Sequence, residues 1–273
     1  MKKKSILSLV LVGVLSLGLI GCGNSNEESD NVIKIGVSPV PHSEIVNSIV
    51  PDLEAKGYEV EVIEFTDYVQ PNIALDNEEL DANYFQHIAY LNSFNADNGT
   101  EISYTAEIHL EPMAAYSYVY ESVEAIKEGA TVAIPNDPSN EARALRVLEE
   151  VGLITLPEGE LITPKDIIDN PKNLEFKELE AAQLPLVLEE VDIAVINGNY
   201  ALDADLDATK DGIASEDGNA DSMKERRNVL AVKKGTEDEQ KIKDLTEALT
   251  SAKVKEFIET EYKGAVVPVF EVK

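Results

Sequence analysis

The chain of 273 residues has no tryptophan, one cysteine, three histidines and few cations. A single cysteine can form neither an intramolecular disulfide nor a Cys-x-x-Cys zinc or redox site. Lys and Arg number 23 against 52 Asp and Glu, which gives a formal net charge of −29. A phosphate backbone is repelled by such a field, and no Lys/Arg cluster lies beyond the first four residues. We therefore expect no nucleic-acid partner.

Motifs of the common enzyme classes are also missing. The sequence contains no G-x-G-x-x-G, P-loop, G-x-S-x-G, H-E-x-x-H or EF-hand pattern. Its many carboxylates come in runs such as 149–150 and 189–190, which are typical of solvated helix faces. Spacing therefore singles out no acid–base pair, and we expect neither enzymatic activity nor a cofactor.

The three histidines leave one metal hypothesis open. His42, His87 and His109, with one carboxylate, could form a zinc or manganese site like those of extracellular metal receptors. None of them is paired at four-residue spacing or lies in a His-rich loop, and a hydrogen-bonded or stacked role is the simpler interpretation. A metal-binding receptor of an importer is the alternative function, and no metal ligand is assigned.

The N-terminal region has the pattern of an export signal. Three lysines at 2–4 precede residues 5–20, a run of 16 residues without charge. This run is shorter than the ~20 residues of a membrane-spanning helix, and it is typical of a signal peptide. It ends in Leu19-Ile20-Gly21-Cys22, which resembles the bacterial lipobox. We therefore predict that residues 1–21 are removed and that Cys22 is lipidated.

The segment after Cys22 is small, polar and acidic, GNSNEESDN at 23–31. Such a composition buries no apolar surface and behaves as a flexible tether. We predict that residues 22–31 hold a folded body at the extracytoplasmic face of the cell membrane through a lipid anchor.

From residue 32 onward, β-rich runs alternate with amphipathic helices, which is typical of α/β architecture. The first strand, helix and strand imply parallel pairing through a right-handed crossover. Asp137 followed by Pro138 is a strong signal for a helix start. The predicted strands cover 33–37, 58–65, 131–135, 174–179, 191–196 and 226–233. The predicted helices cover 43–56, 138–152, a stretch between 179 and 191, 237–251 and 253–261.

Several phrases resemble those of one family. They are VSPVPHSEI (37–45), DYVQPN (67–72), DANYFQH (81–87), EPM…YS (111–117), IPNDPSNEARAL (134–145), ELEAAQLP (178–185), VDIAVINGNYA (191–201) and YKGAVVPVF (262–270). In this order they resemble the NlpA/MetQ lipoprotein family, the methionine-binding proteins of ABC importers. The resemblance covers about 32–270.

The resemblance implies an α/β, two-lobed periplasmic-binding-protein fold of type II-like architecture, with a ligand cleft between the lobes. We expect residues 32–118 with 226–273 in lobe 1 and 119–225 in lobe 2. The implied function is a lipid-anchored receptor that binds methionine and delivers it by hinge closure to an ABC permease with a cytoplasmic ATPase.

A zwitterionic amino acid needs a cation for its carboxylate, polar groups for its ammonium and a dry slot for its side chain. Arg143 follows the strand at 131–135 in the opening turns of a helix, where it could grip a carboxylate bidentately. Asn140 precedes it by three residues on the same helix face. Asn197 comes at the carboxyl end of a predicted strand, where α/β sheets bind ligands. The resemblance assigns ligand contacts to Arg143 and Asn197.

Aromatic side chains in the matching phrases could form the slot for a thioether, because rings pack well against sulfur. The candidates are Tyr68, Phe85 and His87, with Tyr84, Tyr90 and His109 as further ones. Packing in the core is the competing interpretation of this cluster.

The chain departs from the family where glycine is common, with Ala114-Ala115 after EPM and Ala142 before Arg143. Extra methyl groups near a pocket would reshape it. The resemblance also covers receptors for methionine isomers and for a methionine-containing dipeptide. The ligand is therefore expected to be L-methionine or a close analogue.

Overall fold

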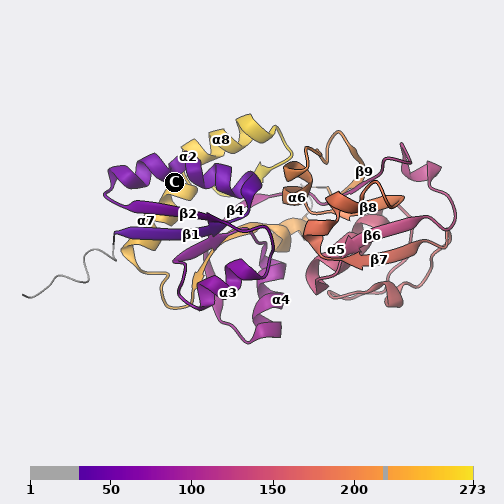
Figure 1. Cartoon of the computed structure of the whole chain (residues 1–273), viewed down its shortest axis with the longest axis horizontal. Helices are drawn as coiled ribbons and strands as arrows, with labels where there is room; N and C mark the ends of the chain where they lie inside the picture. Colours follow the sequence, from indigo (N-terminus) through magenta and orange to yellow (C-terminus); the bar gives the residue numbers. More distant parts are fainter. Residues whose placement is uncertain (1–30, 218–220, 273) are drawn as a thin grey trace, which may run out of the picture.

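The computed structural model describes residues 31–217 and 221–272. They form two lobes, each built around one β-sheet (Figure 1). The predicted signal peptide, Cys22 and all but the last residue of the predicted tether lie outside the described residues. Within the two described ranges, no helix combines the length and apolar character needed to cross a membrane.

The first lobe contains a six-stranded sheet in the order β11-β4-β10-β3-β1-β2. Its strands are β1 (Val32–Val37), β2 (Glu59–Glu64), β3 (Ala82–Tyr84), β4 (Ile102–Leu110), β10 (Asn228–Lys233) and β11 (Val267–Pro268). Strand β1 pairs in parallel with β2 and β3, as the first strand, helix and strand predicted. Strand β10 runs antiparallel to both of its neighbours.

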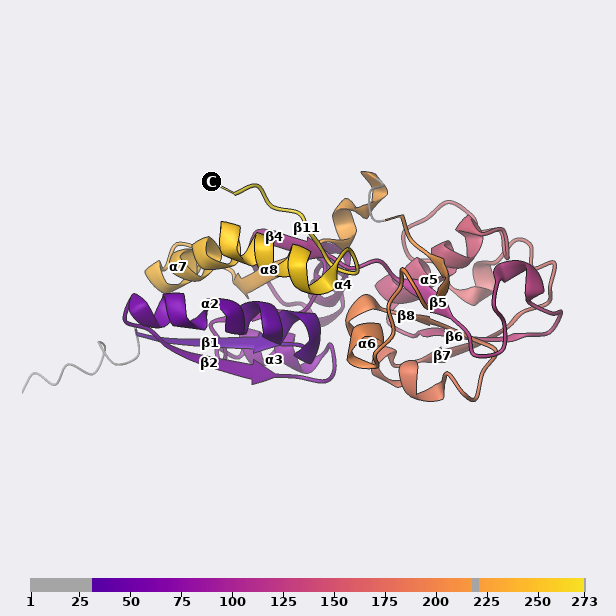
Figure 2. The ribbon, with the colours of Figure 1, turned by 90° about the horizontal axis from the view of Figure 1, so that it is seen from above.

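Helices cover both faces of this sheet (Figures 1 and 2). One face carries α2 (Glu44–Ala55), α7 (Gln240–Leu249) and α8 (Ala252–Tyr262), and the other carries α3 (Gln70–Asp76) and α4 (Ile88–Asn98). The apolar stripe of α2 is fully buried against the sheet, as its spacing predicts. That stripe consists of Ile45, Val46, Ile49 and Leu53.

The second lobe contains a five-stranded sheet in the order β7-β6-β8-β5-β9. Its strands are β5 (Ala114–Tyr116), β6 (Thr131–Pro135), β7 (Glu175–Leu179), β8 (Ile193–Ile196) and β9 (Gly212–Ser215). Helix α5 (Pro138–Glu150) packs on one face, and α6 (Gly198–Asp203) packs on the other. Short helical turns complete the chain: η1 (Pro39–Ser43), η2 (Val123–Ala125), η3 (Pro164–Asp166), η4 (Ala181–Gln183), η5 (Pro185–Val187) and η6 (Asp221–Arg226).

The two sheets share one topology. In each, three parallel strands are followed by an antiparallel strand that enters from the other lobe, which is β10 in the first sheet and β5 in the second. This arrangement confirms the predicted two-lobed α/β fold.

The chain passes from the first lobe to the second at residues 111–113 and returns to the first between β9 and β10. The two passages are tied to each other, because Glu216 N donates to Met113 O at 3.0 Å and Met113 N donates to the Glu216 carboxylate at 2.8 Å. Strand β5 pairs in the second sheet, so residues 114–116 belong to the second lobe and not to the first as expected. A three-residue strand is too short to be recognised by its pattern.

One predicted helix is wrong. The stretch between 179 and 191 forms the short turns η4 and η5 and not a continuous helix. Pro185 lies in the middle of it, lacks a backbone N–H and disfavours helical geometry in the residue before it. The predicted start of α5 is confirmed, because Asp137 caps it by accepting from Asn140 N at 3.0 Å.

Candidate ligand-binding cavity

A small cavity lies between the lobes. Its lining comes from both lobes and from the first passage between them. The first lobe contributes Tyr68, Phe85, Gln86, His87, Tyr90 and Asn228. The second lobe contributes Asn140, Arg143, Asn197, Gly198 and Asn199, and the passage contributes Glu111. Seven of the nine predicted binding residues therefore meet at one place.

Arg143 projects from α5 and is almost fully buried. Its Nε donates to Glu216 Oε1 at 2.8 Å, and its Nη2 donates to Glu216 Oε2 at 2.6 Å and to the Glu111 carbonyl at 2.8 Å. Burial alone would lower the pKa of Arg143, but the Glu216 carboxylate outweighs it and holds that pKa above its usual value. The guanidinium is thus a fixed cation at the junction of the two passages.

Three polar side chains next to Arg143 form an amide-rich cluster. Asn140 Oδ1 accepts from His87 Nε2 at 3.0 Å and from Asn197 Nδ2 at 2.8 Å. Asn197 Oδ1 is buried and has no hydrogen-bond partner within the described part of the chain. Buried acceptors without a partner are rare and need an explanation. A ligand donor in the cavity would supply the missing bond.

Aromatic side chains from the first lobe form another part of the cavity wall. The Tyr68 ring centroid lies 5.9 Å from that of Phe85 and 5.5 Å from that of Tyr90. Tyr68 Oη donates to Asn199 Oδ1 across the lobes at 2.5 Å, and Tyr90 Oη donates to the Tyr68 carbonyl at 2.9 Å. The hydroxyl groups are satisfied within the protein, so the wall presents ring surface to the cavity.

Tyr84 and His109 do not line the cavity, contrary to expectation. Successive side chains of a strand point to opposite faces of its sheet, and β3 ends at Tyr84. Phe85 therefore packs on the side of α3 and α4, whereas Tyr84 packs with α2, α7 and α8. Tyr84 hydrogen-bonds there to Nδ1 of His109. The sequence did not reveal this alternation, because no strand was predicted at 82–84.

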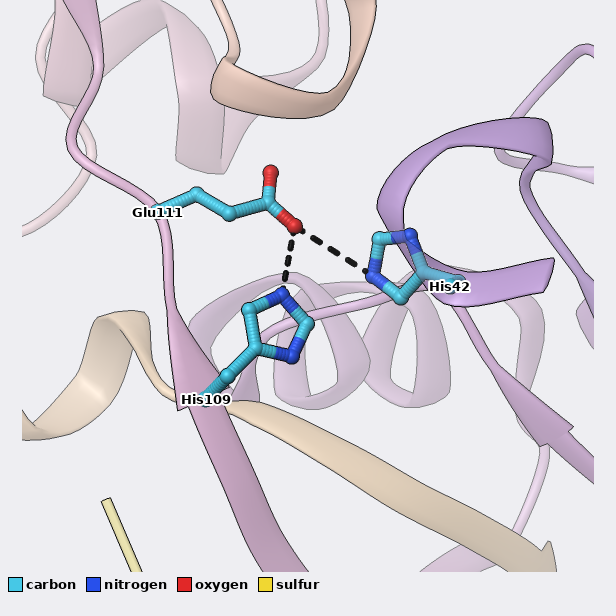
Figure 3. A group of neighbouring side chains, drawn as sticks. All are labelled: His42, His109 and Glu111. Atoms are coloured by element: carbon cyan, nitrogen blue, oxygen red, sulfur yellow. Dashed lines mark hydrogen bonds and ion pairs between the residues drawn. The ribbon is translucent and has the colours of Figure 1, made fainter. Parts of the chain in front are cut away.

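His109 belongs to a buried cluster with His42 and Glu111 (Figure 3), and of these three Glu111 lines the cavity. Its Nε2 lies 2.6 Å from Glu111 Oε1, and His42 Nε2 lies 3.5 Å from the same oxygen and 3.1 Å from Asn228 Oδ1. Burial lowers the pKa of His42 to about 4, so this ring is neutral at pH 7. Burial on its own raises the pKa of Glu111, but the hydrogen bond from His109 and the nearby charges outweigh it and lower that pKa.

The metal hypothesis fits this cluster poorly. The candidate donor atoms of His42, His109 and Glu111 lie within 4.8 Å of one another, but His87 is bonded to Asn140 elsewhere. A tetrahedral zinc ion with bonds of ~2.0 Å keeps its donor atoms roughly 3.3 Å apart. The 2.6 Å between His109 and Glu111 is a hydrogen-bond distance. The cluster is therefore described best as a hydrogen-bonded network.

Sequence reasoning missed five lining residues: Gln86, Glu111, Gly198, Asn199 and Asn228. The first four lie inside or directly beside the recognised phrases, where a closer reading could have found them. Asn228 begins β10, and nothing around it in the sequence marks it.

The sequence model described as NlpA lipoprotein matches residues 33–270. The chain belongs to the NlpA lipoprotein family. Among NlpA relatives, it is 40% identical to "Methionine-binding lipoprotein MetQ" of Bacillus subtilis, with 99% of this chain and 100% of the relative covered. It is 37% identical to "Membrane lipoprotein TpN32" of Treponema pallidum, with 98% of each covered.

Solved structures agree with the NlpA assignment. A nutrient binding protein of Burkholderia cenocepacia, solved bound to methionine, superposes with a TM-score of 0.83 at 44% identity over 87% of this chain and 100% of that one. A lipoprotein of Ruminococcus gnavus superposes with a TM-score of 0.85 at 45% identity, over 88% and 99% of the two chains.

Proposed function

We propose that the chain is a lipid-anchored extracytoplasmic receptor that binds methionine or a close analogue without catalysis. The observation that carries this proposal is a cavity between the two lobes that combines a guanidinium, a carboxylate, an aromatic wall and an amide oxygen without a hydrogen-bond partner among the described residues. The methionine-bound relative, at 44% identity, supports the same class of ligand.

The proposed ligand is oriented by its charges. Nε and Nη2 of Arg143 are occupied by protein acceptors, so Nη1 receives the ligand carboxylate. Glu111 and Asn197 Oδ1 receive the ammonium, because both are acceptors in the cavity lining. Tyr68, Phe85 and Tyr90 pack around the thioether, whose contacts with ring edges are worth ~0.3–1.5 kcal/mol each.

Binding occurs by hinge closure in this proposal. Residues 111–113 and Glu216, which are hydrogen-bonded to each other, lie at the hinge, and hydrogen bonds across the cavity form when the lobes meet. Closure excludes water from the guanidinium and carboxylate, which strengthens their contacts with the ligand.

The proposed partners are a membrane permease and its cytoplasmic ATPase, which receive the ligand. Lipid on Cys22 keeps the receptor at the membrane surface, and residues 23–31 serve as a tether that lets the folded body move relative to the membrane. A metal-binding receptor remains the competing hypothesis for the His42 cluster, and metal analysis of the purified protein separates the two.

Calorimetric titration of the body from residue 23 onward, after unfolding and refolding to remove retained ligand, tests the proposal. L-methionine, D-methionine and glycyl-methionine are titrated in parallel, with L-leucine as a control that lacks sulfur. Saturable binding of one sulfur ligand, with L-leucine much weaker, supports the proposal and names the ligand. A folded sample that binds none of them refutes it.

A further inference from the structure

The Glu216 carboxylate is hydrogen-bonded to groups of the protein itself. It accepts from Nε and Nη2 of Arg143 at 2.8 and 2.6 Å and from the Met113 amide at 2.8 Å. The side chains of Arg143 and Glu216 are only 4% and 8% exposed. A bidentate pair of this kind fixes the plane of the guanidinium as well as its position. Arg143 therefore meets a ligand as a cation that already has its counter-ion.

The Glu111 carboxylate, unlike that of Glu216, is not paired with an arginine among the described residues. Tyr84 is fully buried, and the described contacts give its hydroxyl one partner, His109 Nδ1. A buried O–H needs an acceptor, and Nδ1 of His109 is the partner that the Tyr84 hydroxyl has. On the other side of the ring, Nε2 of His109 donates to Glu111 Oε1 at 2.6 Å. In the described part of the chain, the Glu111 carboxylate is hydrogen-bonded to this histidine and forms no ion pair with a Lys or Arg.

The other titratable groups around the cavity do not reverse this balance. Burial keeps His87 neutral, because its pKa lies well below the usual value. Outside the lining, Arg226 interacts with Arg143 and with the carboxylates of Glu216, Glu225 and Asp137, and burial lowers its pKa to about 10, so it remains a cation. Arg143 is therefore paired directly with Glu216, whereas among the described residues no Lys or Arg forms an ion pair with the Glu111 carboxylate in the cavity lining.

We infer that Glu216 is the positioning residue of Arg143 and that, by pairing with it, Glu216 makes the ammonium end of a ligand a stronger determinant of binding than the carboxylate end. The inference rests on the proposed function, because it assumes that a zwitterionic amino acid occupies the cavity. It differs from a simple guanidinium–carboxylate site, in which removal of the ligand carboxylate would be the more damaging change.

Two truncated ligands separate these possibilities without adding bulk. Methylthiopropylamine keeps the ammonium and thioether of methionine, and methylthiobutanoic acid keeps the carboxylate and thioether. In the wild-type protein the amine is expected to bind about tenfold more tightly than the acid, the scale of one charged hydrogen bond. A wild-type protein that binds methionine but prefers the acid overturns the inference and leaves the proposed function standing. A protein that binds no methionine refutes the proposed function instead.

Variants then test whether Glu216 causes the preference for the amine over the acid. Glu216→Gln removes the counter-ion of Arg143, so the amine-to-acid preference is expected to move toward the acid by about tenfold. Glu149→Gln is the matched control, because Glu149 pairs with Arg146 on the same helix outside the cavity. An equal preference in both variants would show that Glu216 has no such role.

A conservative variant keeps the test decisive if Glu216→Gln does not fold. Glu216→Asp keeps the charge but shortens the reach, so methionine affinity is expected to fall about tenfold while the amine remains preferred. Full methionine affinity in this variant, or a reversed preference, overturns the positioning role.

Discussion

His87 and Asn140 are hydrogen-bonded across the gap between the two lobes, with 3.0 Å between Nε2 and Oδ1. The proton is on Nε2, because Nδ1 of the same ring accepts from the Tyr90 amide at 3.1 Å and caps α4. Asn140 Oδ1 also accepts from Asn197, so one amide oxygen joins the first lobe to two elements of the second. The closed arrangement therefore depends on that oxygen.

Asn140→Leu is expected to weaken methionine binding by about 1–3 kcal/mol. The substitution leaves the N–H groups of His87 and Asn197 buried without an acceptor in the closed state, which favours the open state. Calorimetric Kd values and the radius of gyration measured with ligand report the effect. Asn47→Leu, on the exposed face of α2, is the control. An unchanged Kd in Asn140→Leu would contradict a role in closure.

Tyr200 provides another contact between the lobes, and it lies outside the cavity lining. Its hydroxyl donates to the Thr66 carbonyl at 3.1 Å, and its ring lies 4.9 Å from that of Tyr68. Tyr200→Phe is expected to cost about 0.5–1.5 kcal/mol of affinity, mainly through faster ligand release. Stopped-flow dissociation measures this, with Tyr118→Phe as an exposed control. Equal release rates in both variants would show that the Tyr200 hydroxyl does not hold the lobes closed on the ligand.

Arg143→Lys is expected to reduce methionine affinity by at least about 1.5 kcal/mol although the positive charge remains. The lysine ammonium is a point charge and cannot form the bidentate hydrogen bonds that the guanidinium donates to Glu216. The same loss should appear as lower stability of the ligand-free protein in urea. Arg146→Lys, on the same helix and more exposed, should change neither quantity by as much. Wild-type affinity in Arg143→Lys would remove Arg143 from the site.

Acidification is expected to destabilise the protein partly through His42. The pKa of His42 is about 4 in the folded chain and about 6.5 unfolded. Between those values the unfolded state binds a proton that the folded state does not, so stability falls as the pH falls, by up to about 1.4 kcal/mol per pH unit for this group. Glu141, whose burial raises its pKa to about 7, acts with the opposite sign.

His42→Gln removes this contribution while keeping a side chain that can donate to Asn228. Urea unfolding at pH 7 and pH 5 should therefore show a smaller loss in the variant than in the wild type. Glu141 is present in both proteins, so its effect cancels in the comparison. Equal losses would mean that His42 is protonated in the folded protein.

Much of this arrangement was predictable from sequence. The cap at Asp137, the apolar strand β6 and the apolar stripe of α2 are local signals. The structure forms the predicted strand and helices at these places. The recognised phrases led to Arg143, Asn140 and Asn197, which the fold brings together.

What the sequence could not provide depends on long-range pairing. Tyr84 and Phe85 are adjacent, but which one faces the cavity depends on the pairing of β3 with β1 and β10. Glu216 meets Arg143 from 73 positions away, and no spacing reveals such a partner. The predicted position of His109 in the cavity wall is wrong for the same reason. Only the fold shows that Glu111, and not His109, lines the cavity.

Gly198 provides the sharpest steric prediction. A Cβ at this position would lie 2.6 Å from Glu111 Cβ and 3.3 Å from the Pro112 carbonyl, so neither a backbone shift nor a rotamer change relieves it at low cost. Gly198 belongs to the second lobe and Glu111 to the passage, and Gly198→Ala is therefore expected to push Glu111 out of place. Methionine affinity should fall at least about tenfold, because the ammonium loses the carboxylate among its two proposed acceptors. Wild-type affinity, together with a normal melting temperature, would show that Glu111 can move without loss and does not hold the ligand.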